Sequence, residues 1–512
     1  MTPLHLPSLH RLTSSGRLSR WGFVRLCLAL ALAFASLFTM ICATALPAQA
    51  APSSKAVRTD PPKHTEGDIG QLPAEVQAAL QRAKVPSENF HVMVVDTHTG
   101  STPRLSHQAQ VRVNPASLMK LATTTAALDT LGPAFVWRTP VYVDGPVRDG
   151  VLQGNVYIRG SGDPRLGVER LWLLMRRIQG LGIQKIQGDI VLDRSAFDVP
   201  ARDAASFDGE PLRPYNAAPD ALLLNFKSLL IQFVPDRAAN LARVQIEPPL
   251  AGVQFPTAVP LSNGDCNDYR GALRADWSDP TRIKFAGNFP AVCGEKMWPI
   301  AYAAPQQFAP RAITGMWQQL GGQLIGQVRD GSVPTHLQPI FNVESATLAE
   351  TIRDINKFSN NVMAQQLFLT LSQQQRGVGS FDASREVMQR WWRERVGGEV
   401  PTFDNGSGLS REERISAQAL ARLLQVAWAS PNMSELMSSL PVTGLDGTMK
   451  RSKAQASAHL KTGSLRDVAG VAGFVDTASG KRLVVVAILH HANANAARPA
   501  LDAMIDWAGK QP

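Results

Sequence analysis

The sequence has 512 residues and a formal net charge of +10 at pH 7. A chain of this length is too long for one compact hydrophobic core, so more than one domain is expected. The basic balance does not indicate nucleic-acid binding, because no cluster of lysine and arginine is interleaved with aromatic residues. Without the four arginines of the first 25 residues the net charge falls to +6, a modest excess that suits an anionic polymer as partner.

The first 50 residues have the pattern of a signal peptide. Four arginines and no acidic residue flank the start of an apolar run from Leu26 to Leu46, and Pro47 to Ala50 then supply a small-residue cleavage site. We therefore predict export by a cleaved signal at residues 1–50 and a periplasmic location. The apolar run is long enough to span a bilayer, so an uncleaved N-terminal anchor is the alternative. No later stretch of the sequence approaches that length.

Cysteine usage fits an exported chain. Cys27 and Cys42 lie in the predicted signal, which leaves Cys266 and Cys293. In an oxidising compartment a disulfide between these two is favoured over two free thiols. A metal site would need further ligands nearby and the sequence shows none, so we predict neither a metal nor a cofactor.

The predicted elements begin after a polar tail at residues 51–72. Residues 90–95 have the composition of a strand. A helix is expected to start at Ser117 and to end at Gly132-Pro133, because apolar residues recur with helical spacing at Leu118, Leu121, Leu128 and Leu131. A helix N-terminus offers free N–H groups and a positive dipole end, which suit a nucleophile and a developing oxyanion.

A long β-rich stretch follows. Short strand-like runs separated by Gly and Pro turns occupy residues 141–192, and a second such group, with runs at 244–246 and 282–286, lies in the region that contains the two cysteines. We predict that residues 138–342 are nested inserted domains, with a second lobe at about 213–302. The flanking parts, 51–137 and 343–512, are expected to form one domain together.

The C-terminal part alternates helices and strands. Leu348, Ile352 and Ile355 predict a helix capped at Ser345, and residues 358–361 interrupt it before a second helix. Strands are expected at 469–475 and 483–489, followed by a helix over about 497–508. With the strand near residue 90, these elements predict an α/β (α+β) fold in which an antiparallel sheet joins both chain ends and helices flank it.

Three short motifs carry the chemistry: Ser117-x-x-Lys120, Ser359-x-Asn361 and Lys461-Thr462-Gly463. Each is weak alone, since such strings also occur on exposed helices, at helix caps and in turns. In this order they match the set used by enzymes in which a lysine assists acylation of a serine. Ser117 is the predicted nucleophile, Lys120 the base one helical turn away, and Ser359 a proton relay. Burial and a second cation would lower the pKa of Lys120 toward the neutral amine that a base requires.

The same motifs predict a substrate site. Asn361 can hold a substrate amide, while Lys461 and Thr462 can bind a terminal carboxylate. Gly463 would keep the strand edge clear for the substrate backbone. The backbone N–H groups of Ser117 and Ser464 are the expected oxyanion donors.

The chain resembles the penicillin-binding protein 4 (DacB) type of D-Ala-D-Ala carboxypeptidase/endopeptidase, a class C low-molecular-mass penicillin-binding protein. The resemblance covers most of the sequence after the signal, including the long insertion after the first motif. It implies cleavage of D-Ala-D-Ala bonds and cross-links in peptidoglycan peptides, and covalent inhibition by β-lactams. Beyond the three motifs it rests on residues 160–164, 215–219, 405–411 and 444–449.

One segment departs from the family pattern. The segment 207–214, before Tyr215, is shorter than in related chains, which carry there an acid for the diaminopimelate amine. Asp208 or Glu210 is the candidate to replace that acid; the alternative is that each is an ordinary acid on an exposed loop.

Two other functions share parts of the pattern. A serine β-lactamase has the three motifs but a compact layout, and the separation of 239 positions from Lys120 to Ser359 argues against such a layout. A non-catalytic wall-binding protein would not need the intact reactive residues.

Overall fold

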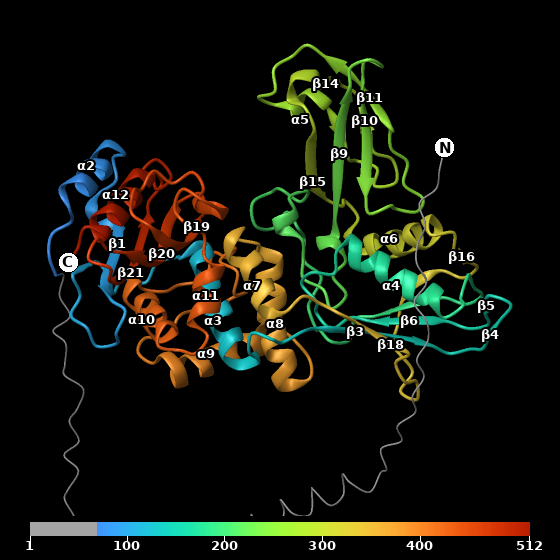
Figure 1. Cartoon of the computed structure of the whole chain (residues 1–512), viewed down its shortest axis with the longest axis horizontal. Helices are drawn as coiled ribbons and strands as arrows, with labels where there is room; N and C mark the ends of the chain where they lie inside the picture. The colour runs from blue at the N-terminus through green and yellow to red at the C-terminus, as the bar shows by residue number, and fades with distance from the viewer. Residues whose placement is uncertain (1–68) are drawn as a thin grey trace, which may run out of the picture. The chain divides into compact units, whose positions relative to one another are not determined.

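The computed structural model describes residues 69–512 (Figure 1). The predicted signal peptide and most of the predicted polar tail lie outside these residues. Within residues 69–512, none of the helices has both the length and the apolar character that crossing a bilayer requires.

Both ends of the described chain contribute to one five-stranded antiparallel sheet, in the order β19-β20-β21-β1-β2. Figure 1 shows β1, from the start of the described chain, beside β21 near its end. This arrangement confirms the predicted α/β class with a sheet that joins the two ends. The strand bounds are β1 Phe90–Asp96, β2 Leu105–His107, β19 Ala458–Ser464, β20 Val468–Asp476 and β21 Arg482–His490.

Helices cover both faces of this sheet, so its central strands are apolar at almost every position. Along β1, Val92 and Val94 pack on one face in a core with α2 (Ala74–Arg82) and α12 (Arg498–Gly509). Met93 and Val95 point to the opposite face, into a larger helical core. Alternate side chains of a strand face opposite sides, and each buried aliphatic side chain contributes roughly 1.5–3 kcal/mol.

The larger core is built from helices that surround α3 (Met119–Leu131). Every side chain of α3 from Met119 to Leu128 is buried, because neighbouring helices enclose it. The surrounding helices are α7 Leu348–Lys357, α8 Asn361–Arg376, α9 Phe381–Trp391, α10 Ala417–Trp428 and α11 Met433–Ser439.

The interruption predicted between two helices lies between α7 and α8. The N-cap of α7 is Thr347 and not Ser345, because Thr347 forms a reciprocal capping box with Glu350. Asn360 caps α8, its side chain accepting the N–H of Met363 at 3.1 Å. Between the helices Ser359 has φ +57°, a left-handed conformation that is uncommon outside glycine. The motif serine is therefore held at a sharp corner of the chain.

Residues 138–344 contain the other large sheets and have a separate hydrophobic core. One five-stranded sheet has the order β17-β8-β6-β3-β18, and its neighbours β3 (Arg138–Val143) and β18 (Phe341–Glu344) form the start and the end of the segment. The second has the order β14-β11-β10-β9-β15. The remaining bounds are β6 Val156–Arg159, β8 Ile190–Asp193, β9 Ser228–Asp236, β10 Leu241–Glu247, β11 Ala258–Ser262, β14 Phe289–Pro290, β15 Lys296–Ala301 and β17 Val328–Asp330, with helices α4 Val168–Gly180, α5 Tyr269–Leu273 and α6 Pro305–Gln319. A four-stranded sheet of short strands has the order β16-β7-β5-β4, with β4 Val147–Arg148, β5 Val151–Leu152, β7 Lys185–Ile186 and β16 Gln323–Leu324, and β12 Ala275–Asp276 pairs with β13 Lys284–Phe285.

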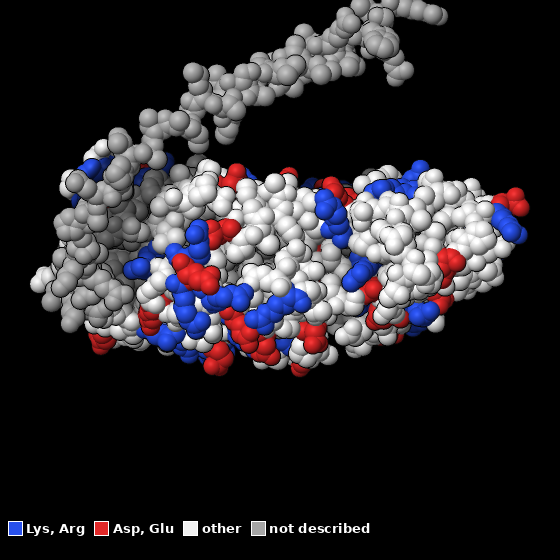
Figure 2. Space-filling model, turned by 90° about the horizontal axis from the view of Figure 1, so that it is seen from below, with Lys and Arg blue, Asp and Glu red and all other residues white. Residues whose placement is uncertain are grey.

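Charged side chains of both signs are interspersed on the face of the described chain shown in Figure 2. Ion pairs between exposed partners occur in the described chain, such as Arg138 with Glu344 at 3.0 Å. Exposed pairs of this kind contribute little to stability, typically about 0–1 kcal/mol. The charge pattern of this face therefore bears on solubility more than on folding.

Candidate active site

Ser117 lies in a single 3₁₀ turn, Ala116–Leu118, that leads into α3. The side-chain amide of Asn114 connects this turn to a distant loop. Its Oδ1 accepts the N–H of Ala116 at 2.8 Å, and its Nδ2 donates to the carbonyl of Ser410 at 2.8 Å. Ala116 has φ +48°, a strained conformation for a residue with a Cβ. Strain of this kind persists only where surrounding contacts impose it, so the backbone at Ser117 is tightly constrained.

The amine of Lys120 lies beside the Ser117 hydroxyl. Its Nζ is 3.0 Å from Ser117 Oγ and 2.6 Å from Asn361 Oδ1, and it also donates to the carbonyl of Ser407. The side chain is completely buried, and this burial lowers the pKa of Lys120 to about 7, against an opposing effect of the Glu413 carboxylate. A neutral amine has two N–H groups and one lone pair. If the two oxygens of Asn361 and Ser407 accept the N–H groups, the lone pair is left for the Ser117 hydroxyl.

A second buried amine adjoins the first. Lys461 Nζ donates to Ser359 Oγ at 2.9 Å and to the carbonyl of Thr462 at 2.8 Å. Burial lowers the pKa of Lys461 well below its ordinary value, and the positive charge of Lys120 lowers it further. Two adjacent buried ammonium groups would repel each other, so the site favours a state with at most one of them charged.

Residues Thr462 to Ser464 are the end of β19, the outer strand of the sheet. Thr462 Oγ1 donates to Thr448 Oγ1 at 2.7 Å, and Ser464 Oγ accepts a hydrogen bond from Arg498. A Cβ on Gly463 would lie 2.6 Å from the carbonyl oxygen of Pro115. Glycine at this position therefore lets the strand approach the turn that carries Ser117.

A cleft of about 960 Å³ opens over these groups. Neither Lys120 nor Lys461 is among its lining residues; both amines lie beneath its surface. The segment 138–344 also contributes to the wall. Residues that line the cleft include Ser117, Asp208, Tyr215, Ser359, Asn361, Leu409, Arg411, Thr462 and Ser464.

The shortened segment before Tyr215 places one of its two acids on the cleft. Asp208 accepts hydrogen bonds from the Tyr215 hydroxyl at 2.9 Å and from Asn216 Nδ2 at 2.8 Å. Partial burial raises the pKa of Asp208, but these hydrogen bonds outweigh it and the pKa lies below its ordinary value. Glu210 instead pairs with Arg213 at 3.3 Å and does not line the cleft.

The structure adds residues that the motifs did not point to. The Ser407 carbonyl reaches Lys120, and the completely buried Glu413 binds the turn that contains Ser407. Glu413 stands in the run Arg411-Glu412-Glu413-Arg414, which has the composition of a solvated surface loop, so no sequence signal distinguished it. Arg411 lies on the cleft wall with its guanidinium 4.6 Å from the centre of the Phe207 ring.

The remaining candidates lie elsewhere. Cys266 and Cys293 are joined by a disulfide, with their Cα atoms 5.1 Å apart. In the part of the chain that the structure describes, no group of three or more His, Cys, Asp or Glu side chains is arranged to hold a metal ion.

The structure brings the half-buried Ser117 beside the buried amine of Lys120, the pairing that the motifs predict for a serine-type hydrolase. Residues 72–511 match the model of the D-Ala-D-Ala carboxypeptidase 3 (S13) family, and the chain belongs to this family. The prediction of a penicillin-binding protein 4 type enzyme is thereby confirmed.

Individual relatives agree with this assignment. The chain is 26% identical over 441 residues to a D-alanyl-D-alanine carboxypeptidase of Actinomadura sp. strain R39, covering 81% of this chain and 80% of that protein. It is 26% identical over 411 residues to D-alanyl-D-alanine carboxypeptidase DacB of Haemophilus influenzae, covering 78% and 82%. The crystal structure of penicillin binding protein 4 (dacB) from H. influenzae shares the fold, with a TM-score of 0.68, 22% identity, and coverage of 85% of this chain and 99% of that one.

Proposed function

We propose that this protein is an exported serine D-Ala-D-Ala carboxypeptidase and D,D-endopeptidase that acts on peptidoglycan peptides through an acyl-enzyme. One observation carries the proposal: a buried amine, with a pKa of about 7, lies 3.0 Å from a serine hydroxyl at the cleft. Such an amine is partly neutral at physiological pH and can accept the proton of the attacking hydroxyl. Family membership supports the choice of substrate.

The chemistry proceeds in two steps. Ser117 Oγ attacks the carbonyl carbon between the two D-Ala residues while Lys120 takes the hydroxyl proton, and the N–H groups of Ser117 and Ser464 stabilise the oxyanion. The C–N bond then breaks, and Ser359, hydrogen-bonded to Lys461, passes a proton to the leaving amine. Water hydrolyses the resulting ester by the reverse proton path and restores the serine. A β-lactam enters the first step through its own amide bond and remains attached to Ser117.

Substrate contacts follow from the residues on the cleft wall. Asn361 uses Oδ1 for Lys120, which leaves its Nδ2 to donate to a substrate carbonyl. The hydroxyls of Thr462 and Ser464 line the cleft and are the groups that we expect to bind the terminal carboxylate. The amine of Lys461 lies behind this wall on Ser359, and this position favours proton handling over direct contact with a carboxylate.

The layout of the chain belongs to the same proposal. We infer that residues 1–50 are removed after export to the periplasm, and that residues 138–342 are inserted in a domain made of 51–137 and 343–512. The pairing of β3 with β18 supports these boundaries, because it brings the two ends of the insertion together.

The test is digestion of purified muropeptides by the protein without its first 50 residues, followed by mass spectrometry. Release of D-Ala and of cross-linked dimers into monomers is expected. Ser117→Ala should abolish both, and Lys120→Ala should leave about 1% or less of the activity, with an unchanged circular dichroism spectrum. Near-normal turnover by Lys120→Ala at neutral pH would show that the base is wrong.

Reaction with nitrocefin separates the proposal from the β-lactamase alternative. A peptidase should give one burst and a stable adduct, because it does not activate water against this acyl-enzyme. Fast multiple turnover would instead support a β-lactamase. A chain that neither hydrolyses peptides nor binds fluorescent penicillin at Ser117 would be a non-catalytic wall-binding protein.

A further inference from the structure

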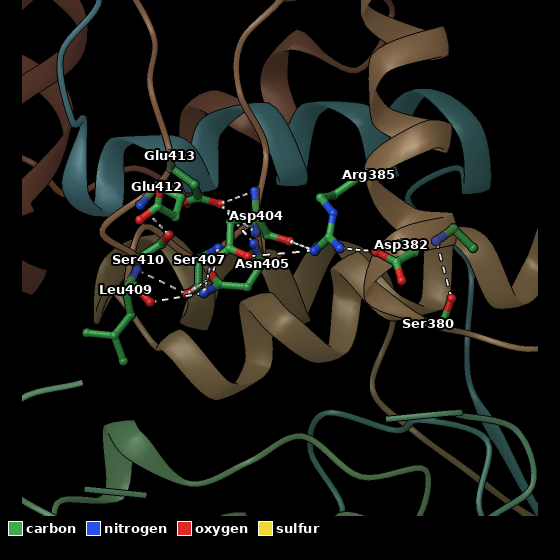
Figure 3. A network of polar contacts seen from close by, with 12 residues as sticks. Ser380, Asp382, Arg385, Asp404, Asn405, Ser407, Leu409, Ser410, Glu412 and Glu413 are labelled. Carbon is green, nitrogen blue, oxygen red and sulfur yellow. Dashed lines mark hydrogen bonds and ion pairs between the residues drawn. The ribbon is translucent and has the colours of Figure 1, made fainter. Parts of the chain in front are cut away.

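Glu413 is a completely buried carboxylate that the mechanism above does not use. It accepts four backbone N–H groups from one tight turn, and Figure 3 shows Glu413 beside Asp404 and Asn405 of this turn. Its Oε1 accepts from Asp404 at 3.3 Å, Asn405 at 3.2 Å and Gly406 at 2.7 Å, and its Oε2 accepts from Gly408 at 2.8 Å. A carboxylate with this many donors fixes the backbone around it, because each N–H would otherwise be buried without a partner.

The turn that Glu413 holds is docked on the face of α3 that carries the base. The carbonyl of Gly406 accepts the Thr123 hydroxyl at 2.7 Å, and the carbonyl of Ser407 accepts from the amine of Lys120. Lys120 and Thr123 are neighbours on one helix face, being three residues apart. The turn therefore contacts α3 through two successive carbonyls whose directions depend on the backbone that Glu413 organises.

The Ser407 carbonyl matters for the direction of the lone pair. With one N–H of the neutral amine on Asn361 and the other on Ser407, the lone pair points at Ser117. A shift of the carbonyl would let the amine rotate and donate to the serine in place of accepting from it. We propose that Glu413 is a positioning residue for the acylation step: it holds the Ser407 carbonyl on Lys120 and contributes a buried negative charge close to this base. The proposal rests on the function proposed above.

The charges around Glu413 make its effect on Lys120 testable. Three charged groups bear on Glu413 or on the base. Lys120 of α3 interacts with Glu413, Asp404 of the same turn also interacts with Glu413, and Lys461 of β19 interacts with Lys120. Asp404 is in turn 3.6 Å from Arg385 of α9. Burial raises the pKa of Glu413 to about 7, against the hydrogen bonds from the turn. Ionised Glu413 raises the pKa of Lys120, so removing its charge should lower that pKa.

The experiment compares Glu413→Gln with Glu412→Gln in the full chain. The readout is the second-order rate constant for acylation by a fluorescent penicillin between pH 5 and pH 9. Glutamine removes the charge and turns one N–H acceptor into a donor facing the turn. We expect the plateau rate to fall by up to about 100-fold, as for a misplaced catalytic group, and the acidic limb of the profile to move to lower pH. Glu412 is exposed and carries the same charge, so Glu412→Gln should leave both unchanged.

A purely structural role for Glu413 would lower the rate by one factor at every pH, so an unmoved acidic limb overturns the proposal. If Glu413→Gln does not fold, Glu413→Asp decides, because it keeps the charge but withdraws the carboxylate by one methylene. The plateau rate of Glu413→Asp must then fall, while the acidic limb of its pH profile stays near that of the unchanged protein. A normal plateau rate would contradict the positioning role. Failure of the proposed function would be seen separately, as absence of acylation in the unchanged protein.

Discussion

Lys461 and Ser359 are 102 residues apart in the sequence, yet the lysine amine donates to the serine hydroxyl at 2.9 Å. Lys461 is completely buried, and Ser359 lies between this amine and the cleft. Through this hydrogen bond the Lys461 amine can supply a proton to the Ser359 hydroxyl, which lines the cleft. It also separates the roles of neighbouring residues on β19, since Thr462 lines the cleft and Lys461 does not.

This separation predicts different kinetic effects for two adjacent substitutions. Thr462→Val removes a hydroxyl from the wall and should raise KM for peptides with a free terminal carboxylate about 10-fold or more, with kcat nearly unchanged. Lys461→Met removes the partner of Ser359 and should lower kcat in larger proportion than it raises KM. Steady-state kinetics on a D-Ala-D-Ala peptide measure both. The assignment is wrong if Lys461→Met acts on KM alone.

The buried amine of Lys120 predicts a pH-dependent stability. Its pKa is about 7 in the folded chain and 10.5 ordinarily, so between these values the unfolded chain binds a proton that the folded chain does not. The free energy of unfolding should therefore rise with pH in this window, by at most about 1.4 kcal/mol for each pH unit. Lys120→Met lacks the titrating group. Urea unfolding of both proteins at several values from pH 7 to pH 10 should show a growing difference in favour of the unchanged protein, and parallel curves would contradict the low pKa.

Gly408 predicts a sensitive backbone position next to the nucleophile. It has φ +79°, and a Cβ would lie 1.9 Å from the carbonyl oxygen of Ala116 and 2.6 Å from the N of Ser117. These are backbone atoms that cannot rotate away, so Gly408→Ala should displace the turn and lower the acylation rate by roughly 100-fold. The matched control is Gly480→Ala, which has φ +80° and no heavy atom within 4 Å of the added Cβ. Equal effects of the two substitutions would mean that backbone strain alone is responsible.

The disulfide predicts a local effect on stability without an effect on catalysis. Cys266 and Cys293 are 27 positions apart in the sequence and do not line the cleft. Replacing both by serine should destabilise the surrounding β-rich region by about 3 kcal/mol, because the loop gains freedom when unfolded. Limited proteolysis should then cut within residues 254–295, while acylation by penicillin keeps its rate. A lower acylation rate would show that this region communicates with the cleft.

Much of the fold was predictable because its elements have simple patterns. The strands β20 and β21 and the helix α12 lie within about one residue of the expected ranges, since each is a periodic apolar segment between turn residues. The cap of α7 was misplaced by two residues. Ser345 and Thr347 are both good capping residues, and only the reciprocal bond with Glu350 distinguishes them.

The candidate site was predictable in its motifs but not in its environment. Ser117 and Lys120 are three residues apart on one turn, so their contact follows from local geometry. Glu413 could not be found in this way. It looks like one of four charged residues in a surface loop, and its burial arises only when the turn at 404–408 packs on α3.

The sequence by itself determined the chemical groups, their order along the chain, and the helices and strands that carry them, because these depend on residue type and short-range spacing. Tertiary structure decided which groups meet and which protonation state each one favours. The pKa of Lys120 depends on water being excluded by segments as distant as Asn361 and Ser407, and on the nearby charge of Glu413. Desolvation is a property of the packed chain, so no local stretch of sequence encodes it.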